Sequence, residues 1–432
     1  MPGRAAPPAL VGVSLGPARS HAVVIQNRSV ITSLSVAGPD PAELFARIAS
    51  EFRLPVAGIV VDIGRLLLER ILRQPAELSA VAMIRVVPRP ASDPALGRHP
   101  DDVIERLITQ RFTVPGGHDL FGHELRRLDR EALSAVCREI AAHPARCVAV
   151  VAAGAGTQPR HEREVADAVQ AAVPDARISA AHEFGGQGLA AREATVVLNA
   201  ALATAAQDVL DGCERAAQRA MPGVPLHIAR GDGGWNSASR LRVLPVLGLG
   251  ATDALQLRGA AEVAGGDCRV LLRRTPHPVV GDVRRGLVAV RPQVLRDLDT
   301  ALVVPTATLA RAGPDPGAGP AGDVPLVVAD GDPDELACIG AAVSRPTAWL
   351  DEIAFIESTA RLDGVRRDAE ARATAIATAN GAAPGTADIV EVSTVAVPYS
   401  PSGTVRIRVR VAGAPDGATS PVRAAELSPV TG

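Results

Sequence analysis

Lysine is absent from this 432-residue sequence, so all 45 of its Lys and Arg residues are arginine. The absence excludes enzymes that depend on a Schiff-base lysine, on the lysine of a phosphate-binding P-loop or on the lysine of a protein kinase. Aromatic residues make up only 2% of the chain, so alanine, valine and leucine must fill its cores. Because hydrophobic residues reach 47%, those cores can be large.

Cysteine pairs, targeting segments and strong net charge are also missing. The five cysteines are scattered and form no C-x-x-C pair, which argues against a zinc ribbon or a dithiol redox site. The proline-rich N-terminus lacks the apolar stretch of a signal peptide. No uncharged apolar run reaches the about 18 residues that span a bilayer. A net charge of −2 argues against general binding to nucleic acid or anionic membranes. We expect a soluble cytoplasmic protein.

Short apolar runs alternate with helical patterns through the first half of the chain. This alternation predicts an α/β protein with a largely internal sheet, and the length favours two or three domains. Asp40 is placed to cap a helix over 41–52. Other predicted helices cover 101–110 and, as one long alanine-rich segment with a bend at Gly212, 189–221. A hairpin is expected from 389–397 and 404–411.

A glycine-bearing loop, Arg230-Gly231-Asp232-Gly233-Gly234-Trp235-Asn236-Ser237, follows an apolar run of strand length. Two adjacent glycines let the backbone approach a ligand or another chain segment closely. Asp232 suits either a turn, where it accepts backbone N–H groups, or contact with a polar ligand. A tight structural turn is the simpler interpretation of this loop.

Three further constellations have both a chemical and a structural interpretation. His118 and His123, with Asp119 and Glu124, suit a metal cluster or a solvated loop, and the flanking glycines favour the loop. His182-Glu183 suits an acid–base pair or, with the glycines after it, a hinge between lobes. Ser14 or Ser20 as a nucleophile would need a base, and His21 next to Ser20 points to the opposite face of a strand.

Several segments, taken in order, resemble the A-type proteins of the hydantoinase/oxoprolinase family. They cover nearly the whole chain before its last twenty residues. The matching stretches are Leu10–Ile25, Phe112–Pro115 with Leu128–Leu133, Gln158–Arg163, Arg192–Leu202, Arg230–Ser237, Leu336–Val343 and Ala371–Arg410.

The resemblance implies an actin-like ATPase architecture of the ribonuclease H-like kind, with two α/β lobes and a cleft between them. Family members couple ATP hydrolysis to the opening of a cyclic amide such as a hydantoin or 5-oxoproline. Related subunits activate ketones for carboxylation, usually with a B-type partner chain. The domains expected on this basis are an N-terminal lobe (1–180), a second lobe (181–345) with a Gly/Pro-rich insertion (311–324), a C-terminal helix and hairpin (346–412) and a disordered tail (413–432). The loop at Arg230 would lie in the second lobe, near the cleft.

The first phosphate loop of the family carries two carboxylates around glycines and hydroxyl residues. Backbone N–H groups of such a hairpin bind phosphate, and the carboxylates hold Mg²⁺. In this chain Ser14 stands at the first carboxylate position and His21 at the second. Pro17 between them removes a backbone donor. The sequence therefore predicts that this loop has lost its Mg²⁺-binding function.

The other two nucleotide loops of the family also depart from the pattern. The second corresponds to residues 271–280, which contain Arg273 and Arg274 but no glycine and no carboxylate. The third falls at residues 327–332, where Asp330 and Asp332 flank a single glycine and would repel phosphate. Three losses at one site predict a chain that does not hydrolyse ATP.

The sequence thus favours a non-catalytic or regulatory subunit that binds a B-type subunit or a second copy of itself, with no cofactor and no metal. One alternative is an ATP-dependent cyclic-amide hydrolase or carboxylase subunit that uses ATP and Mg²⁺. Another is a small-metabolite binding protein that uses the cleft without hydrolysis. No catalytic residue is assigned, and the candidate cofactor-binding residues are Gly12, Ser14, Gly16, Ser20, Asp232, Gly233 and Gly234.

Overall fold

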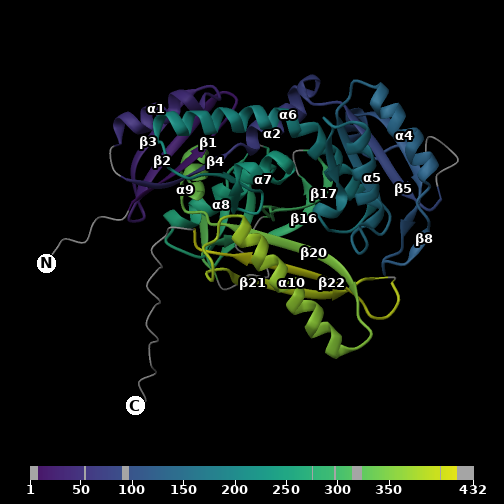
Figure 1. Ribbon diagram of the computed structural model, residues 1–432. Coiled ribbons are helices and arrows are strands. Elements are labelled where there is room, and N and C mark those ends of the chain that lie inside the picture. The colour runs from purple at the N-terminus through teal and green to yellow at the C-terminus, as the bar shows by residue number, and fades with distance from the viewer. Residues whose placement is uncertain are drawn as a thin grey trace, which may run out of the picture.

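Two sheets of the molecule have a related design, and strands β1 to β4 of the first lie at the upper left of Figure 1. The computed structural model describes residues 8–52, 55–89, 97–274, 276–295, 298–313, 324–398 and 400–415. The first sheet has the order β12-β11-β4-β1-β2-β3, in which β1 is antiparallel to β2 and parallel to β4. Its strands are β1 (Ala9–Ser14), β2 (Arg19–Gln26), β3 (Ser29–Ala37), β4 (Val56–Asp62), β11 (Leu226–Ala229) and β12 (Trp235–Ser237).

The second sheet repeats this arrangement. Its order is β15-β14-β13-β19, with β13 antiparallel to β14 and parallel to β19. The short strand β18 pairs with β14, and the two-stranded ribbon of β16 and β17 precedes β18 in the chain. These strands are β13 (Cys268–Leu272), β14 (Val279–Arg284), β15 (Leu287–Val288), β16 (Val290–Leu295), β17 (Thr300–Ala307), β18 (Ala310–Arg311) and β19 (Leu326–Ala329).

A third, entirely parallel sheet is inserted between β4 and β11. Its order is β10-β9-β5-β6, and it has its own apolar core. The helix expected over 101–110 is wrong in its second half, because α3 ends at Leu107 and β6 begins at Ile108. The unit comprises η1 (Pro75–Glu77), β5 (Val81–Val87), α3 (Asp102–Leu107), β6 (Ile108–Pro115), β7 (Gly117–His118), β8 (Glu124–Arg126), α4 (Arg130–Ala142), β9 (Cys147–Ala152), α5 (Arg160–Ala172), β10 (Arg177–Ala180) and η3 (Ala181–Glu183).

One long helix, α6 (Leu189–Ala220), connects the inserted unit with the first sheet (Figure 1). The helix is continuous through Gly212. Its alanine-rich first half is almost entirely buried and packs on β9 and β17, whereas its later turns lie beside α1 (Pro41–Glu51). Asp40 caps α1 as expected, by accepting the backbone N–H groups of Ala42 and Glu43.

Helices α2 (Gly64–Arg73), α8 (Ala251–Val263) and α9 (Pro333–Ala342) bring their first turns together between the two main sheets. Glycines let α8 and α9 approach closely, since a Cβ at Gly259 would lie 1.9 Å from the carbonyl oxygen of Leu336. Asp332 caps α9 by accepting the backbone N–H of Asp334. Two short elements, α7 (Ala238–Val243) and η4 (Pro245–Gly248), lead into α8.

The C-terminal unit is a three-stranded antiparallel sheet with order β20-β22-β21, covered by α10 (Thr359–Ala379). The hairpin expected near 389–411 is confirmed as β21 (Asp388–Ala396) and β22 (Thr404–Ala412). The sequence analysis assigned no element to β20 (Thr347–Phe355), which pairs with β22 along its whole length.

The proposed domain boundaries stay predictions, and β11 and β12 join the sheet of β1 although they lie in 181–345. Most of the expected insertion (residues 314–323) and of the expected tail (residues 416–432) lies outside the described residues. Within the described part of the chain, none of the helices combines the length and apolar character that a membrane span requires.

Candidate functional site

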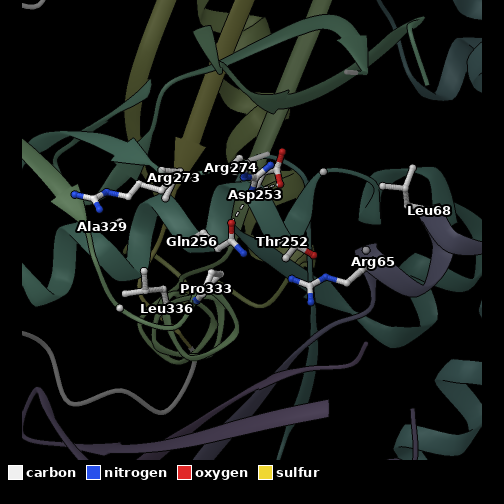
Figure 2. Close-up of a pocket in the computed structure, with 14 residues that line it drawn as sticks. Arg65, Leu68, Thr252, Asp253, Gln256, Arg273, Arg274, Ala329, Pro333 and Leu336 are labelled. Carbon is white, nitrogen blue, oxygen red and sulfur yellow. Dashed lines mark hydrogen bonds and ion pairs between the residues drawn. The ribbon is translucent and has the colours of Figure 1, made fainter. Parts of the chain in front are cut away.

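A cavity of about 260 Å³ lies between the two main sheets, at the first turns of α2, α8 and α9 (Figure 2). The end of β13 and the segment after β19 complete its walls. It therefore occupies the position of an interlobe cleft. Its lining residues are Gly64, Arg65, Leu68, Gly250, Thr252, Asp253, Gln256, Leu272, Arg273, Arg274, Ala329, Gly331, Pro333 and Leu336.

Asp62, the last residue of β4, is a fully buried carboxylate behind this cavity. It accepts hydrogen bonds from the Thr252 hydroxyl (2.6 Å), the Gly64 backbone N–H (2.8 Å) and, more weakly, the Ser14 hydroxyl (3.4 Å). Burial raises the pKa of the Asp62 carboxyl, and these hydrogen bonds oppose the rise. Asp62 thus joins β1, β4 and α8, and its oxygens are already engaged.

Arginines enter the cavity from both sides, and each has an acidic partner (Figure 2). Arg65 lies 2.6 Å from Asp334 in the first turn of α9. Arg274 lies 2.5 Å from both Asp253 and Gln256 on α8, as the dashed lines of Figure 2 mark. These contacts connect α2 to α9 and β13 to α8, so they tie the walls of the cavity together.

The pair of Arg273 and Asp330 is different, because both side chains are about 70% exposed (71% and 69%) at a separation of 3.3 Å. Exposed pairs of this kind contribute little to stability. Arg273 is therefore the cavity arginine most readily released to an incoming anion.

A Mg²⁺ ion does not fit this donor set. Magnesium requires carboxylate oxygens that are free to enter a near-octahedral shell. Among the described residues, Asp62 is saturated by hydroxyl and backbone donors, whereas Asp253 and Asp334 are held by arginines. The arrangement suits an anion that competes for arginine, without a metal.

Comparisons with known proteins match the region from α3 to α5. The family model described as the hydantoinase/oxoprolinase N-terminal region matches residues 99–173. Residues 99–173 are thus similar to the hydantoinase/oxoprolinase N-terminal region. This match contains three of the segments on which the resemblance rested, 112–115, 128–133 and 158–163, and it confirms the resemblance. A search of curated protein sequences finds no match to this hydantoinase/oxoprolinase-like chain.

Solved structures show a similar fold over more than nine-tenths of this hydantoinase/oxoprolinase-like chain. The nucleotide-free structure of acetone carboxylase, described for ATP-dependent acetone carboxylation, aligns with a TM-score of 0.64 at 10% identity, covering 94% of this chain and 88% of that one. The ATP-dependent caprolactamase from Pseudomonas jessenii aligns with a TM-score of 0.71 at 11% identity, covering 97% and 90%. The expected two-lobed, actin-like α/β architecture is confirmed, and at these identities the likeness concerns the fold.

The predicted phosphate-loop residues of this hydantoinase/oxoprolinase-like chain contribute to backbone packing and turns. A Cβ at Gly12 would lie 1.8 Å from the carbonyl oxygen of Cys338, so Gly12 lets β1 pack against α9. At Gly16 a Cβ would lie 2.5 Å from the carbonyl oxygen of Arg19, within the β1–β2 turn. Ser20 donates a hydrogen bond to the backbone carbonyl of Gly38 (2.7 Å). Ser14 is connected to the cavity through Asp62, and His21 lies 3.4 Å from Asp334, the partner of the cavity residue Arg65.

The Asp232-Gly233-Gly234 loop forms the turn between β11 and β12, at the edge of the first sheet. The loop thus belongs to the sheet of β1, whereas the resemblance implied a position in the second lobe. Asp232 accepts from Gly234 N–H (3.2 Å) and the Thr347 hydroxyl (2.8 Å) and pairs with Arg230. No residue of this loop lines the interlobe cavity.

His118 and Glu124 come together with His161, and not with His123 as considered from the sequence. The ligand atoms of these three residues lie within 4.8 Å of one another. However, Nδ1 of His161 accepts the Gly117 backbone N–H (2.9 Å), so its Nε2 carries the proton and donates it to Glu124 (3.0 Å). A metal would need that nitrogen unprotonated. The cluster is better explained as a hydrogen-bonded support for the loop.

His182 also has a structural partner. Its ring nitrogen lies 2.9 Å from the fully buried Glu162, which accepts the backbone N–H of Ala152 and pairs with Arg192 as well. This network joins β9, α5, η3 and α6. Desolvation raises the pKa of Glu183, the other half of the considered acid–base pair, and the charge of His182 opposes the rise.

Sequence reasoning missed Asp62, Arg65, Thr252 and Asp253. A usable signal existed for Asp62, because a carboxylate directly after an apolar strand and before a glycine-led helix marks the end of a sheet where ligands bind. For Thr252 there was no local signal, since its contact with Asp62 spans 190 positions of sequence.

Proposed function

We propose that this hydantoinase/oxoprolinase-like chain is a subunit that does not hydrolyse ATP and acts through a partner chain. The observation that carries the proposal is the bonding of the carboxylates at the interlobe cavity. Asp62, Asp253 and Asp334 each have a hydroxyl, backbone or arginine partner, so no pair of them is available for Mg²⁺. Phosphoryl transfer in nucleotide-binding folds relies on such a metal ion to neutralise developing charge.

The partner surface that we propose is the outer edge of β21. In the sheet order β20-β22-β21, this nine-residue strand has one side without a strand neighbour among the described residues. It is rich in β-branched residues, contains no proline, and exposes Ile389 (43%) and Val395 (56%). Long apolar edge strands are templates for pairing with another chain. A B-type subunit or a second copy of this chain would add a strand there.

The second candidate is an ATP-dependent enzyme, either a cyclic-amide hydrolase of the hydantoin or 5-oxoproline type or a carboxylase subunit. The fold relatives are described as ATP-dependent, and the cavity offers three arginines to a polyphosphate. In that case Arg274 would turn from Asp253 to phosphate and leave the carboxylate to Mg²⁺. A third candidate, a metabolite-binding protein, would use the same cavity without a metal.

Calorimetric titration with ATP, with and without Mg²⁺, tests the proposal. We expect no Mg²⁺-dependent binding by the purified chain. Micromolar binding that requires Mg²⁺, about −8 kcal/mol, would overturn it. The variant Asp253→Asn serves as the matched control, because it would abolish such binding only if Asp253 were a metal ligand. Binding of ATP without Mg²⁺ dependence would favour the metabolite-binding candidate over both others.

A further inference from the structure

A second cavity, of about 150 Å³, lies where the first sheet, the inserted unit and the C-terminal sheet meet. Residues of η3, β12, α7, β17, β20 and α10 line it. It shares no lining residue with the interlobe cavity. Its volume is about that of an engineered cavity that admits one benzene molecule. A ligand for this cavity is thus the size of one small ring.

Three side chains in its lining carry buried polar atoms that have no hydrogen-bond partner among the described residues. The amide of Asn236 is fully buried, and neither its nitrogen nor its oxygen has a hydrogen bond. The indole N–H of Trp349 and the Nε–H of Arg230 are unpartnered as well. A buried polar atom left unpaired costs about 1–3 kcal/mol, so such atoms in native proteins normally have a partner. Three of the four unpaired atoms are donors.

The charges around Arg230 also favour an anion. Asp232 lies 3.2 Å from Arg230, while its backbone oxygen accepts from Arg410 (2.8 Å). All three residues are at most 5% exposed, so two buried guanidinium groups lie beside one buried carboxylate, which pairs with Arg230, while Arg410 donates to backbone oxygens. Burial lowers the pKa of Arg410. Glu391, which pairs in register with Arg410, is an exposed residue of β21. An additional negative charge would stabilise this pair of arginines.

The acidic residues of the lining do not offset this excess. Asp351 is held by Arg406 (2.5 Å), and Glu352 is paired with Arg372. Glu183 lies in the exposed part of the lining. The remaining walls are largely apolar and include Leu244, Leu247, Val304 and Ile376. The cavity therefore combines an apolar body with a group of hydrogen-bond donors beside a positive charge.

We propose that this cavity binds a small monocarboxylate with a ring-sized apolar body. The carboxylate would accept hydrogen bonds from Arg230, Trp349 and Asn236, and the body would pack against Leu247 and Val304. Charge-assisted hydrogen bonds of this kind are stronger than those between neutral groups. The inference is independent of the function proposed for the interlobe cavity, because the two cavities have no residue in common.

Tryptophan emission and thermal unfolding of the full chain test the inference. The probe is cyclopentanecarboxylate, and its neutral twin is cyclopentanecarboxamide, with sodium chloride as the ionic-strength control. The chain has two tryptophans, so loss of the signal in Trp349→Phe assigns it to the cavity. We expect the carboxylate, and not the carboxamide, to shift the emission and raise the unfolding midpoint.

Replacement Asn236→Ala should weaken carboxylate binding about tenfold, which corresponds to about 1.4 kcal/mol. Arg366→Ala, on the half-exposed face of α10, is the matched control and should bind as the original chain does. Unfolding midpoints without probe establish that each variant is folded. The inference is wrong if the original chain binds neither probe, binds both equally, or binds the carboxylate no better than Asn236→Ala does. The first two outcomes need no variant.

Discussion

His227 illustrates how burial without a hydrogen-bond partner at Nδ1 lowers the pKa of a side chain. Its ring stacks on Trp235 at 3.7 Å between centroids, and its Nδ1 has no hydrogen bond. Burial lowers the pKa of His227 to about 4, from an ordinary value of 6.5. As the pH falls through this window the unfolded chain takes up a proton that the folded chain does not, so folding stability decreases.

His227→Phe should therefore flatten the loss of stability between pH 6.5 and about 4. The phenyl ring keeps the stacking on Trp235 but cannot be protonated. A shift of this size corresponds to up to about 3 kcal/mol over the whole window. Urea unfolding of both proteins across the window measures the difference. Equal slopes in the two proteins would contradict the assigned pKa.

Residue-level predictions from the sequence succeeded where the cause was local and failed where it was not. Asp40 was identified as a cap because its effect reaches only two or three residues along the chain. Asp232 was correctly associated with a tight turn, since Gly234 lies two positions away. The role of Asp62 depends on Thr252 in a helix distant in sequence, and the surroundings of the Asn236 amide come from elements far apart in the chain. Neither leaves a local pattern.

Close packing of β1 on α9 determines which substitutions β1 can tolerate at Gly12. A Cβ at Gly12 would lie 1.8 Å from a backbone oxygen of α9, and a backbone atom cannot rotate away as a side chain can. We expect Gly12→Ala to destabilise the chain by about 1–3 kcal/mol. Thermal or urea unfolding measures the change.

Gly212→Ala is the matched control in α6. There the nearest atom to a new Cβ is Cγ of Pro41, at 3.8 Å, which is ordinary contact. Because alanine is a better helix former, this variant should gain about 0.5–1 kcal/mol. If both variants lose stability to the same extent, the close approach of β1 and α9 is not the cause.

Two strands, β6 and β20, could not be predicted from the periodicity of apolar residues in the sequence. β6 follows α3 without an intervening break, so the helical pattern over 101–110 continued into it, and only its parallel pairing with β5 makes it a strand. β20 contains Asp351 and Glu352 in its centre, which conceals its apolar alternation. Asp351 is tolerated there because Arg406 and Arg408 of the neighbouring strand neutralise it.

At the scale of the whole molecule, β21 provides a self-complementary edge. If two copies pair antiparallel about Val392, Ile389 of one copy lies opposite Val395 of the other, since both are three residues from the centre. Val395→Lys should therefore abolish self-association, because it places a charge against an apolar residue. Light scattering at several concentrations gives the mass. A monomeric original chain would exclude the second copy and direct the search to a B-type subunit, tested by mixing.

The overall architecture was predictable because the family resemblance depends on the order of many segments, each of which is only weakly specific by itself. The path of the chain was not, since β11 returns to the first sheet only after the inserted unit is complete. During synthesis on the ribosome, β1 to β4 therefore emerge early. Until β11 is synthesised, the side of β4 that will pair with it has no strand neighbour. The parallel sheet of the inserted unit is synthesised in that interval and has a core of its own. A nascent chain that stalls before residue 226 will carry a finished inserted unit beside an open strand, and is the form most exposed to chaperones and to aggregation.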